Sequence, residues 1–221
     1  MKLGLVGAGS IGKALATFAI ATGHQAMLSN SRGPNTLLGV AGTIGCKAGT
    51  VAEAAAYGDV VVIAVPLHRL GELNPSVFSG KIVIDANNYS SARDGAIAEI
   101  DERRISTTGY FQRYFPDARV VKAFNTIFSR DLAKGKQILE DGKKRALPIS
   151  GDDKEAKAIV SQLLNDFGYD VVDAGGIAES WRLEKGKPSS GLVSDADDLI
   201  AALKDAERDV DIPFFTWKRR D

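Results

Sequence analysis

The stretch that decides the fold is Lys2–His24, with the sequence KLGLVGAGSIGKALATFAIATGH. Its first residues are apolar and predict a short buried strand. The residues after them repeat at helical spacing, as Ile11, Leu15 and Phe18 show. Gly23 stands where a glycine commonly ends a helix. The stretch therefore predicts a strand, a tight turn and a helix.

The predicted turn carries the glycine pattern G-x-G-x-x-G at Gly7, Gly9 and Gly12. Between a strand and a helix, such glycines permit the tight turn, let the backbone approach a pyrophosphate and allow close helix packing. The free N–H groups at the helix N-terminus favour phosphate charge. The pattern predicts a dinucleotide site, and the alternative is a glycine-rich turn without a ligand.

Further apolar runs of strand length follow, and most of them are separated by helical patterns. They lie within residues 25–29, 43–50, 59–66, 81–88, 119–126, 146–150 and 169–176. Continuous Val/Ile runs that alternate with helices predict a parallel sheet covered on both faces. We expect an α/β protein, with a Rossmann-type doubly wound parallel sheet in residues 1–126 and a small C-terminal α/β lobe in residues 127–221.

Several helices can be predicted from capping residues and periodicity. Thr50 and Glu53 have the spacing of a capping box, and Asp152 and Glu155 mark the start of a later helix. Two more helical patterns cover residues 91–115 and the surroundings of residues 199–203.

The end of the second predicted strand, Met27–Pro34 (MLSNSRGP), lacks an acidic residue. At this place, about 20 residues after the glycines, an Asp or Glu binds the adenosine ribose of NAD. Here the chain has Asn30, Ser31 and Arg32. A carboxylate would repel a 2′-phosphate, whereas a guanidinium makes charge-assisted hydrogen bonds to it. The sequence therefore predicts selectivity for NADP(H), and the alternative is that Arg32 is a solvated loop residue.

Ligands of open parallel sheets bind outside the carboxyl ends of the strands. Many residues at those predicted ends are small or carry amide groups, which suits a flat nicotinamide and its ribose. They are Ala64, Val65, Pro66, Asn87, Asn88, Lys122, Ala123, Phe124 and Asn125. Taken singly, Val65-Pro66 could equally end a strand and Asn87-Asn88 could form a turn, so both alternatives stay open.

The composition indicates small-molecule partners in a reducing compartment. Lys+Arg 28 balance Asp+Glu 28, which gives no electrostatic case for nucleic acid or an anionic membrane. The only cysteine, Cys46, cannot form an internal disulfide or a multi-cysteine metal site. The densest apolar run, residues 60–65, is far too short to cross a membrane. We expect a cytoplasmic protein without a metal, and a homodimer stays open.

Seven segments, in their order and spacing, make the chain similar to the NADP oxidoreductases that use the deazaflavin coenzyme F420. That family includes the NADPH-binding domain of the Steap metalloreductases. The segments are GLVGAGSIGKALA, SNSRGP, TVAEAAAYGDVVVIAVP, VIDANN, FPDARVVKAFNT, LPISGDD and DAGGIAESWRLE. The resemblance extends from Met1 to about Glu184, and SNSR and VVKAFNT are its least generic pieces.

The resemblance implies a Rossmann domain with a small lobe, and a deazaflavin or a flavin (FMN or FAD) stacked against the nicotinamide between them. It implies that Ser31 and Arg32 hold the 2′-phosphate, while Val65-Pro66 and residues 122–125 border the nicotinamide. The pyrophosphate would bind the loop of Gly7, Ala8, Gly9, Ser10, Ile11 and Gly12. Hydride would pass directly to the small-molecule redox acceptor, so no catalytic side chain is needed.

Two regions depart from the family pattern. Several members carry a further Lys or Arg after the Ser-Arg pair, whereas this chain continues with Gly33–Thr36, which weakens the expected phosphate contact. The region after Glu184 also differs, although the second substrate should bind there. It ends in an aromatic-basic tail that we expect to pack on the body through its aromatics, with anion binding as the alternative. The tail contains Phe214, Phe215, Trp217, Lys218, Arg219 and Arg220.

No nucleophile–base constellation can be assembled from the sequence. His24 is expected at the surface, His68 in a loop beyond the fourth strand, and Cys46 buried in a strand. Two other functions stay open: an NADP-dependent reductase of a small imine or carbonyl substrate, and a module that binds NADPH without passing hydride. The former class typically adds a large helical domain, for which the residues after Asn125 are too few.

Overall fold

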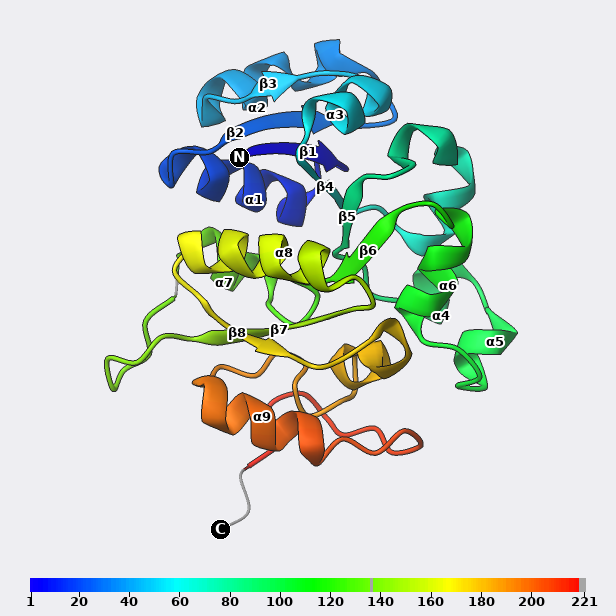
Figure 1. Cartoon of the computed structure of the whole chain (residues 1–221), viewed down its shortest axis with the longest axis vertical. Helices are drawn as coiled ribbons and strands as arrows, with labels where there is room; N and C mark the ends of the chain where they lie inside the picture. Colours follow the sequence, from blue (N-terminus) through cyan, green and yellow to red (C-terminus); the bar gives the residue numbers. More distant parts are fainter. Residues whose placement is uncertain (136, 219–221) are drawn as a thin grey trace.

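The computed structural model describes residues 1–135 and 137–218, in which eight strands form one sheet (Figure 1). The strand order is β3-β2-β1-β4-β5-β6-β7-β8. The order reverses direction between β1 and β4, as in doubly wound sheets, and confirms the predicted Rossmann-type α/β class. The strands are β1 (Lys2–Val6), β2 (Gln25–Ser29), β3 (Lys47–Ala48), β4 (Val60–Ile63), β5 (Ile82–Asp85), β6 (Arg119–Lys122), β7 (Ala146–Gly151) and β8 (Asp170–Asp173).

The sheet is parallel except where β7 meets β6. These two strands are antiparallel, with Val121 opposite Gly151 and Lys122 opposite Ser150, so the sheet is mostly rather than wholly parallel. In its described residues, the connection between β6 and β7 contains the short helix α7 (Ser129–Ala133). The predicted domain boundary at residue 126 falls in this connection and stays a prediction.

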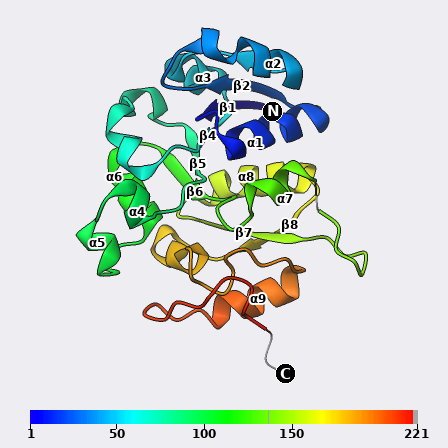
Figure 2. The same cartoon turned by 180° about the vertical axis from the view of Figure 1, so that it is seen from behind.

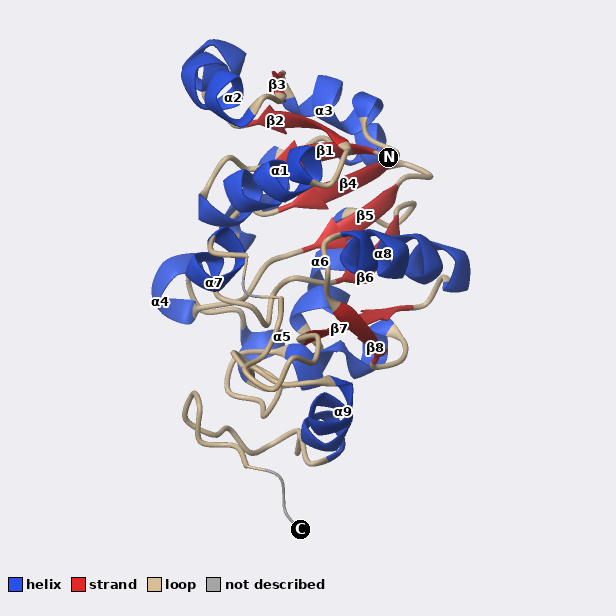
Figure 3. Cartoon of the chain, turned by 90° about the vertical axis from the view of Figure 1, so that its left-hand side faces the viewer, coloured by secondary structure: helices blue, strands red, loops and turns tan. Residues whose placement is uncertain are grey.

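Helices cover both faces of the sheet (Figure 3). On one face, α1 (Ser10–Ala21) and α8 (Lys154–Asp166) bury Leu15 and Leu163 against the strands (Figure 1). On the other face lie α3 (Val51–Tyr57) and α6 (Thr107–Tyr114). A third cluster joins β7 and β8 to α9 (Ala196–Lys204), which confirms the helix expected around residues 199–203. The remaining helices are α2 (Leu38–Ile44), α4 (Ser91–Asp94), α5 (Ala98–Asp101) and the 3-10 helices η1 (Pro34–Leu37), η2 (Leu67–Glu72), η3 (Pro75–Phe78) and η4 (Ile177–Leu183).

The capping predictions are confirmed at one helix and corrected at another. Thr50 and Glu53 form the expected capping box of α3. At α8 the cap is Asp153 rather than Asp152, because the Asp153 side chain accepts from the N–H of Ala156 at 2.9 Å. The Asp152 carboxylate instead accepts from the N–H of Ile177 at 2.8 Å.

The single helical segment expected over residues 91–115 is wrong. Three short helices occupy it, and they lie beside β5 and β6 as the green segment of Figure 2. Gly95, at φ +80°, ends α4, and Arg103, at φ +57°, follows α5. The Ser106 hydroxyl then starts α6 by accepting from the N–H of Gly109 at 3.0 Å. Left-handed residues interrupt a helix because they cannot continue its hydrogen-bond ladder.

Two further local predictions are corrected. The His24 side chain is only 8% exposed, and its Nε2 lies 3.2 Å from Oδ2 of Asp166 at the end of α8, because α8 packs beside α1. Cys46 is half-buried in the connection before β3 rather than within a strand, and burial raises the pKa of its thiol. In the described part of the chain, no helix is long and apolar enough to span a membrane.

The tail packs on the body through its aromatics, as expected. The ring centroid of Phe214 lies 5.7 Å from that of Phe128, and Trp217 donates to Asp205 at 3.0 Å. Arg219 and Arg220, which were part of the predicted tail, lie outside the described residues.

Candidate functional site

The turn between β1 and α1 needs two of its glycines for backbone reasons alone. Gly7 has φ +109°, and a Cβ there would lie 2.3 Å from the carbonyl oxygen of Ala64. A Cβ on Gly12 would lie 1.9 Å from the carbonyl oxygen of Gly7. Gly9 is different, because nothing lies within 4 Å of the place where its Cβ would be. The loop is therefore closed on one side and open beside Gly9.

The N-terminus of α1 is suited to an anion. Gly9 is its N-cap and supplies no side-chain cap, and the first turn contains no acidic residue. The first amide groups of a helix have no partner within the helix, and their dipoles favour negative charge. Ser10 is exposed there, while Ala8 and Ile11 are half-buried. The loop can hold a phosphate against exposed N–H groups.

A cavity of about 630 Å³, which we call the glycine-loop cavity, brings together predicted residues from the ends of β1, β2 and β4. It is lined by the glycine turn, by the turn after β2 and by the residues after β4. The lining residues are Val6, Gly7, Gly9, Asn30, Ser31, Val51, Ala64, Val65, Pro66, His68, Arg69, Glu72 and Leu73.

The turn after β2 is ordered by Asn30 rather than by a carboxylate. Its Oδ1 accepts from the N–H of Arg32 at 3.0 Å, and its Nδ2 donates to Thr36 at 2.9 Å. The Ser31 and Arg32 side chains are exposed, and the Arg32 guanidinium makes no ion pair with any residue in the described ranges. The turn therefore exposes a hydroxyl group and a guanidinium that has no ion-pair partner among the described residues.

The cavity lining contains a carboxylate only at Glu72 among the described residues. That carboxylate is already paired with Arg69, whose Nη2 lies 2.7 Å from its Oε2. A 2′-phosphate near Ser31 would thus meet no unpaired negative charge from the lining.

His68, expected in a loop, lies instead in the 3-10 helix η2 and forms part of the cavity wall. Its Nδ1 lies 3.1 Å from Oδ1 of Asp94, whose side chain is 0% exposed. Burial alone would raise the pKa of Asp94, but hydrogen bonds from Arg93, from the N–H of Ser90 and from His68 lower it to about 2. Asp94 is therefore a fixed anion that orients the imidazole.

The side chains of Lys122, Ala123 and Phe124 do not line the glycine-loop cavity, because all three are buried. Nζ of Lys122 lies 3.0 Å from Oδ2 of Asp85 and also donates to the carbonyl of Asn87. The two ionic residues are in register at the adjacent ends of β5 and β6. Lys122 therefore ties two strand ends together. Asp85 was not predicted as a site residue, although its place at the end of the strand in VIDANN was a usable signal.

A second cavity, of about 220 Å³, contains the other strand-end amides, and we call it the Asn125 cavity. It lies where the β5 and β6 ends meet the start of α1 and two later loops. Its lining residues are Ile11, Asn88, Asn125, Thr126, Ile127, Phe128, Ser129, Lys185, Ser190, Gly191 and Phe214. The turn from Gly7 to Gly12 thus contributes to both cavities. Residues 126–129 of this lining were not predicted from sequence, whereas the region after Glu184 was expected to bind the second substrate.

The two amides of this cavity are locked together. Asn88 Nδ2 donates to the Asn125 carbonyl at 2.8 Å, and Asn125 Nδ2 donates to the carbonyl of Leu183 at 2.6 Å. Asn125 is 6% exposed, yet its Oδ1 has no hydrogen-bond partner in the described part of the chain. Buried polar atoms are nearly always paired. This oxygen is therefore a candidate acceptor for a ligand N–H. Asn87 is buried nearby, and its Nδ2 likewise lacks a partner within those ranges.

Comparison with known proteins shows that part of the chain is similar to an oxidoreductase family. Residues 2–89 match the family model described as NADP oxidoreductase, coenzyme F420-dependent. A solved protein from Arthrobacter sp. FB24, described as a candidate F420-dependent NADP reductase, is 25% identical, with a TM-score of 0.67 over 81% of this chain and 87% of that one. A hypothetical protein from Sinorhizobium meliloti is 32% identical, with a TM-score of 0.75 over 88% of this chain and 96% of that one.

A curated relative is similar over most of this chain. The rat metalloreductase STEAP3 is 29% identical over 185 residues, which are 83% of this chain. The match spans only 36% of the length of that relative. Over residues 2–89 the chain is thus similar to coenzyme F420-dependent NADP oxidoreductases. The solved protein from Arthrobacter extends this similarity over most of the chain.

Proposed function

We propose that this chain transfers a hydride between NADP(H) and a planar acceptor, either the deazaflavin coenzyme F420 or a flavin (FMN or FAD), bound against the nicotinamide. The match of residues 2–89 to a family of NADP oxidoreductases supports the first partner. The observation that carries the proposal is that one turn, from Gly7 to Gly12, lines both the glycine-loop cavity and the Asn125 cavity. A dinucleotide laid across this turn reaches both.

The residues present fit the phosphate groups of NADP(H). The open space beside Gly9 and the uncapped start of α1 would receive the pyrophosphate. The Ser31 hydroxyl and the unpaired Arg32 guanidinium would receive the 2′-phosphate by charge-assisted hydrogen bonds. Arg69 lies in the same cavity, and its pairing with Glu72 keeps that carboxylate from repelling the ligand.

The nicotinamide end is assigned to the Asn125 cavity. The unpaired Oδ1 of Asn125 would accept from the carboxamide N–H, and Asn88 holds Asn125 in place. Val65-Pro66, expected beside the nicotinamide, line the same cavity as Asn30 and Ser31, so we assign them to the adenosine side instead. Lys122 contributes indirectly by fixing the strand end that carries Asn125.

The chemistry requires positioning more than acid–base groups. When bound, NADPH supplies the hydride, which is two electrons and a proton delivered together. The chain must hold two flat rings in contact and exclude water from the space between them. Two contacts fix this part of the site. They are the hydrogen bond between Asn88 and Asn125 and the buried ion pair of Asp85 and Lys122. The proton that completes reduction of the acceptor comes from solvent.

The test is anaerobic mixing of the whole protein with NADPH and, in turn, F420, FMN and FAD, while the bleaching of the acceptor is followed. NADH is the control. Reduction of one acceptor by NADPH, and much slower reduction by NADH, is the expected result. Tight NADPH binding with none of the three acceptors reduced would overturn the proposal. If a small imine or carbonyl compound then oxidised NADPH, the protein would belong to that class of reductase. If no compound oxidised NADPH, it would be a binding module.

A further inference from the structure

The segment after α9, residues 207–214, is fixed to the body by a buried lysine, and we call it the C-terminal strap. Lys187 is only 5% exposed. Its Nζ donates to the carbonyl oxygens of Glu207, Arg208 and Val210 at 2.8–2.9 Å and to Oδ1 of Asp211 at 2.9 Å. A buried ammonium is costly unless its donors are satisfied, so these contacts hold the strap in one place.

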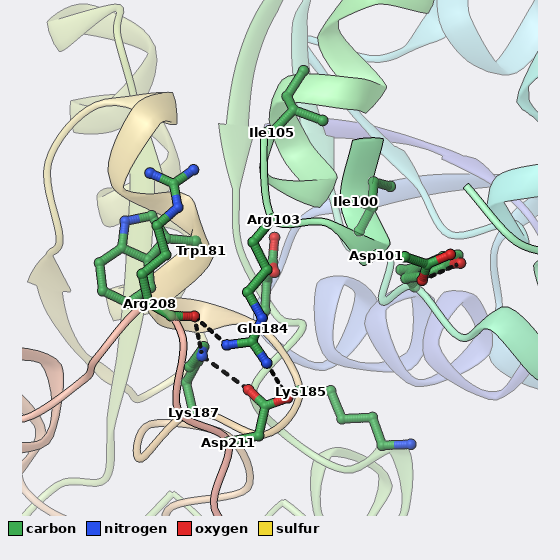
Figure 4. A pocket seen from close by; sticks show the side chains of 11 residues that line it. Ile100, Asp101, Arg103, Ile105, Trp181, Glu184, Lys185, Lys187, Arg208 and Asp211 are labelled. Atoms are coloured by element: carbon green, nitrogen blue, oxygen red, sulfur yellow. Dashed lines mark hydrogen bonds and ion pairs between the residues drawn. The ribbon is translucent and has the colours of Figure 1, made fainter. Parts of the chain in front are cut away.

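Three more hydrogen bonds hold the strap. Arg103 donates to Oδ2 of Asp211 at 2.9 Å and also to the carbonyl of Arg208. The N–H of Ile212 donates to the carbonyl of Gly186 at 2.8 Å. Figure 4 shows Arg103 and Lys187 converging on Asp211 and on the Arg208 carbonyl from different segments. The strap is thus tied two residues before Phe214.

Phe214 forms part of the wall of the Asn125 cavity. Its ring centroid lies 5.7 Å from that of Phe128, which is also in the wall. Gly191 permits this approach, because a Cβ there would lie 2.7 Å from the Phe128 ring and its φ is +76°. The next residue, Phe215, is 64% exposed and does not line the cavity, although its ring also lies near Phe128.

We propose that Phe214 binds the hydride acceptor by stacking on its ring, and that Lys187 positions Phe214 through the strap. The inference rests on the proposed function, since it concerns the acceptor side of the same site. Two aromatic rings in the cavity wall, those of Phe128 and Phe214, suit a planar heteroaromatic molecule. A small aliphatic imine or carbonyl substrate would gain little from the two rings.

The first experiment compares Phe214→Ala with Phe215→Ala as the matched control. Acceptor KM and kcat are measured with F420 and with FMN, and NADPH Kd is measured by fluorescence. We expect Phe214→Ala to raise the acceptor KM about 3–10-fold, in line with the energy of an aromatic contact. Phe215→Ala should not change it, and Phe214→Tyr should restore it. NADPH Kd should stay within about twofold in all three variants, because stacking on the acceptor is the only contact assigned to Phe214.

The second experiment releases the strap with Lys187→Met. The same rise in acceptor KM at unchanged NADPH Kd is expected. If Lys187→Met does not fold, Arg103→Met is used instead. It removes the hydrogen bonds of Arg103 to the strap at a side chain that is only partly buried. Equal acceptor KM values for wild type and Phe214→Ala, or a parallel loss of NADPH binding, would overturn the inference alone. A wild-type protein that reduces none of the acceptors would instead overturn the proposed function on which the inference rests.

Discussion

Nζ of Lys122 lies 3.0 Å from Oδ2 of Asp85, and both side chains are 0% exposed. Thr108 donates to the same carboxylate oxygen at 2.9 Å, and the N–H of Asn87 binds the other oxygen at 3.0 Å. The pair is thus a hydrogen-bonded ionic contact at the strand ends that carry the proposed nicotinamide site. It links the stability of the sheet to the geometry of the site.

Removing one partner of this pair should destabilise the protein strongly. Asp85→Asn leaves the Lys122 ammonium buried without a counterion, which typically costs about 3–5 kcal/mol. Thr108→Val is the control, because it removes a single hydrogen bond worth about 1 kcal/mol. Urea unfolding measures both. Equal losses for the two variants would show that the ionic contact has no special role.

Alanine at two glycines of the turn should have different effects, one on stability and the other on NADPH binding. In Gly12→Ala the added Cβ would lie 1.9 Å from the Gly7 carbonyl, so the backbone must shift and the unfolding free energy should fall. Gly9→Ala meets no protein atom within 4 Å and has a permitted φ of −76°, so its stability should be near wild type. Its NADPH Kd should nevertheless rise about tenfold or more, because the methyl group occupies the phosphate approach. Unchanged NADPH binding in Gly9→Ala would place the pyrophosphate elsewhere.

Arg32→Ala should weaken NADPH binding and leave NADH binding unchanged. A hydrogen bond to a charged group contributes about 1.5–3 kcal/mol, which is about 10- to 150-fold in Kd. Ser31→Ala should act in the same direction with a smaller effect. Arg104→Ala is the control, since Arg104 is an exposed arginine paired with Glu102 outside both cavities. Titration of each variant with both nucleotides tests this, and an equal loss for NADH would contradict a role in 2′-phosphate recognition.

Asp94 should make the protein less stable in acid. Its pKa falls from 3.8 to about 2 on folding, because hydrogen bonds from Arg93, Ser90 and His68 outweigh the opposing effect of burial. A lowered carboxyl pKa stabilises the folded state above the unfolded value, and this contribution is lost as pH falls through the folded value. We expect a loss of roughly 2 kcal/mol between about pH 4 and pH 2.

This pH dependence can be measured by urea unfolding at a series of pH values. Asp94→Asn should be less stable near neutral pH and should lose less stability below pH 4 than wild type. Glu140→Gln, at an exposed site, is the control and should follow wild type. Parallel curves for wild type and Asp94→Asn would contradict the assignment.

The core of the fold could be predicted because its elements are specified locally. The glycine turn, the Thr50–Glu53 box and the Val/Ile strands each depend on neighbouring residues. The direction of β7 and the breaks at Gly95 and Arg103 could not be predicted in this way. The direction of a strand is set by tertiary packing, and the two breaks depend on left-handed backbone, neither of which local periodicity reveals. The homodimer and the cytoplasmic location stay predictions.

In the candidate site, too, locally specified residues could be predicted and residues that depend on distant parts of the chain could not. Gly7, Gly9 and Ser31 were found because their types and spacing carry the phosphate chemistry. Lys122 was expected at the ligand, but register pairs it with Asp85, and sequence alone does not give register. Phe214 was expected to pack on the body, with anion binding as the alternative. Sequence does not show that the C-terminal strap and Lys187 bring it beside Asn125, which lies 89 positions earlier.

The most direct test of direct hydride transfer uses NADPH labelled with deuterium at C4 on either face, with F420 as acceptor under anaerobic conditions. Mass spectrometry of the reduced acceptor then shows where the deuterium went. The two-ring arrangement predicts that one of the two labelled forms, and only one, passes its deuterium to the acceptor ring. Reduced acceptor that carries only solvent hydrogen with both forms would contradict direct transfer and the stacked site proposed for it.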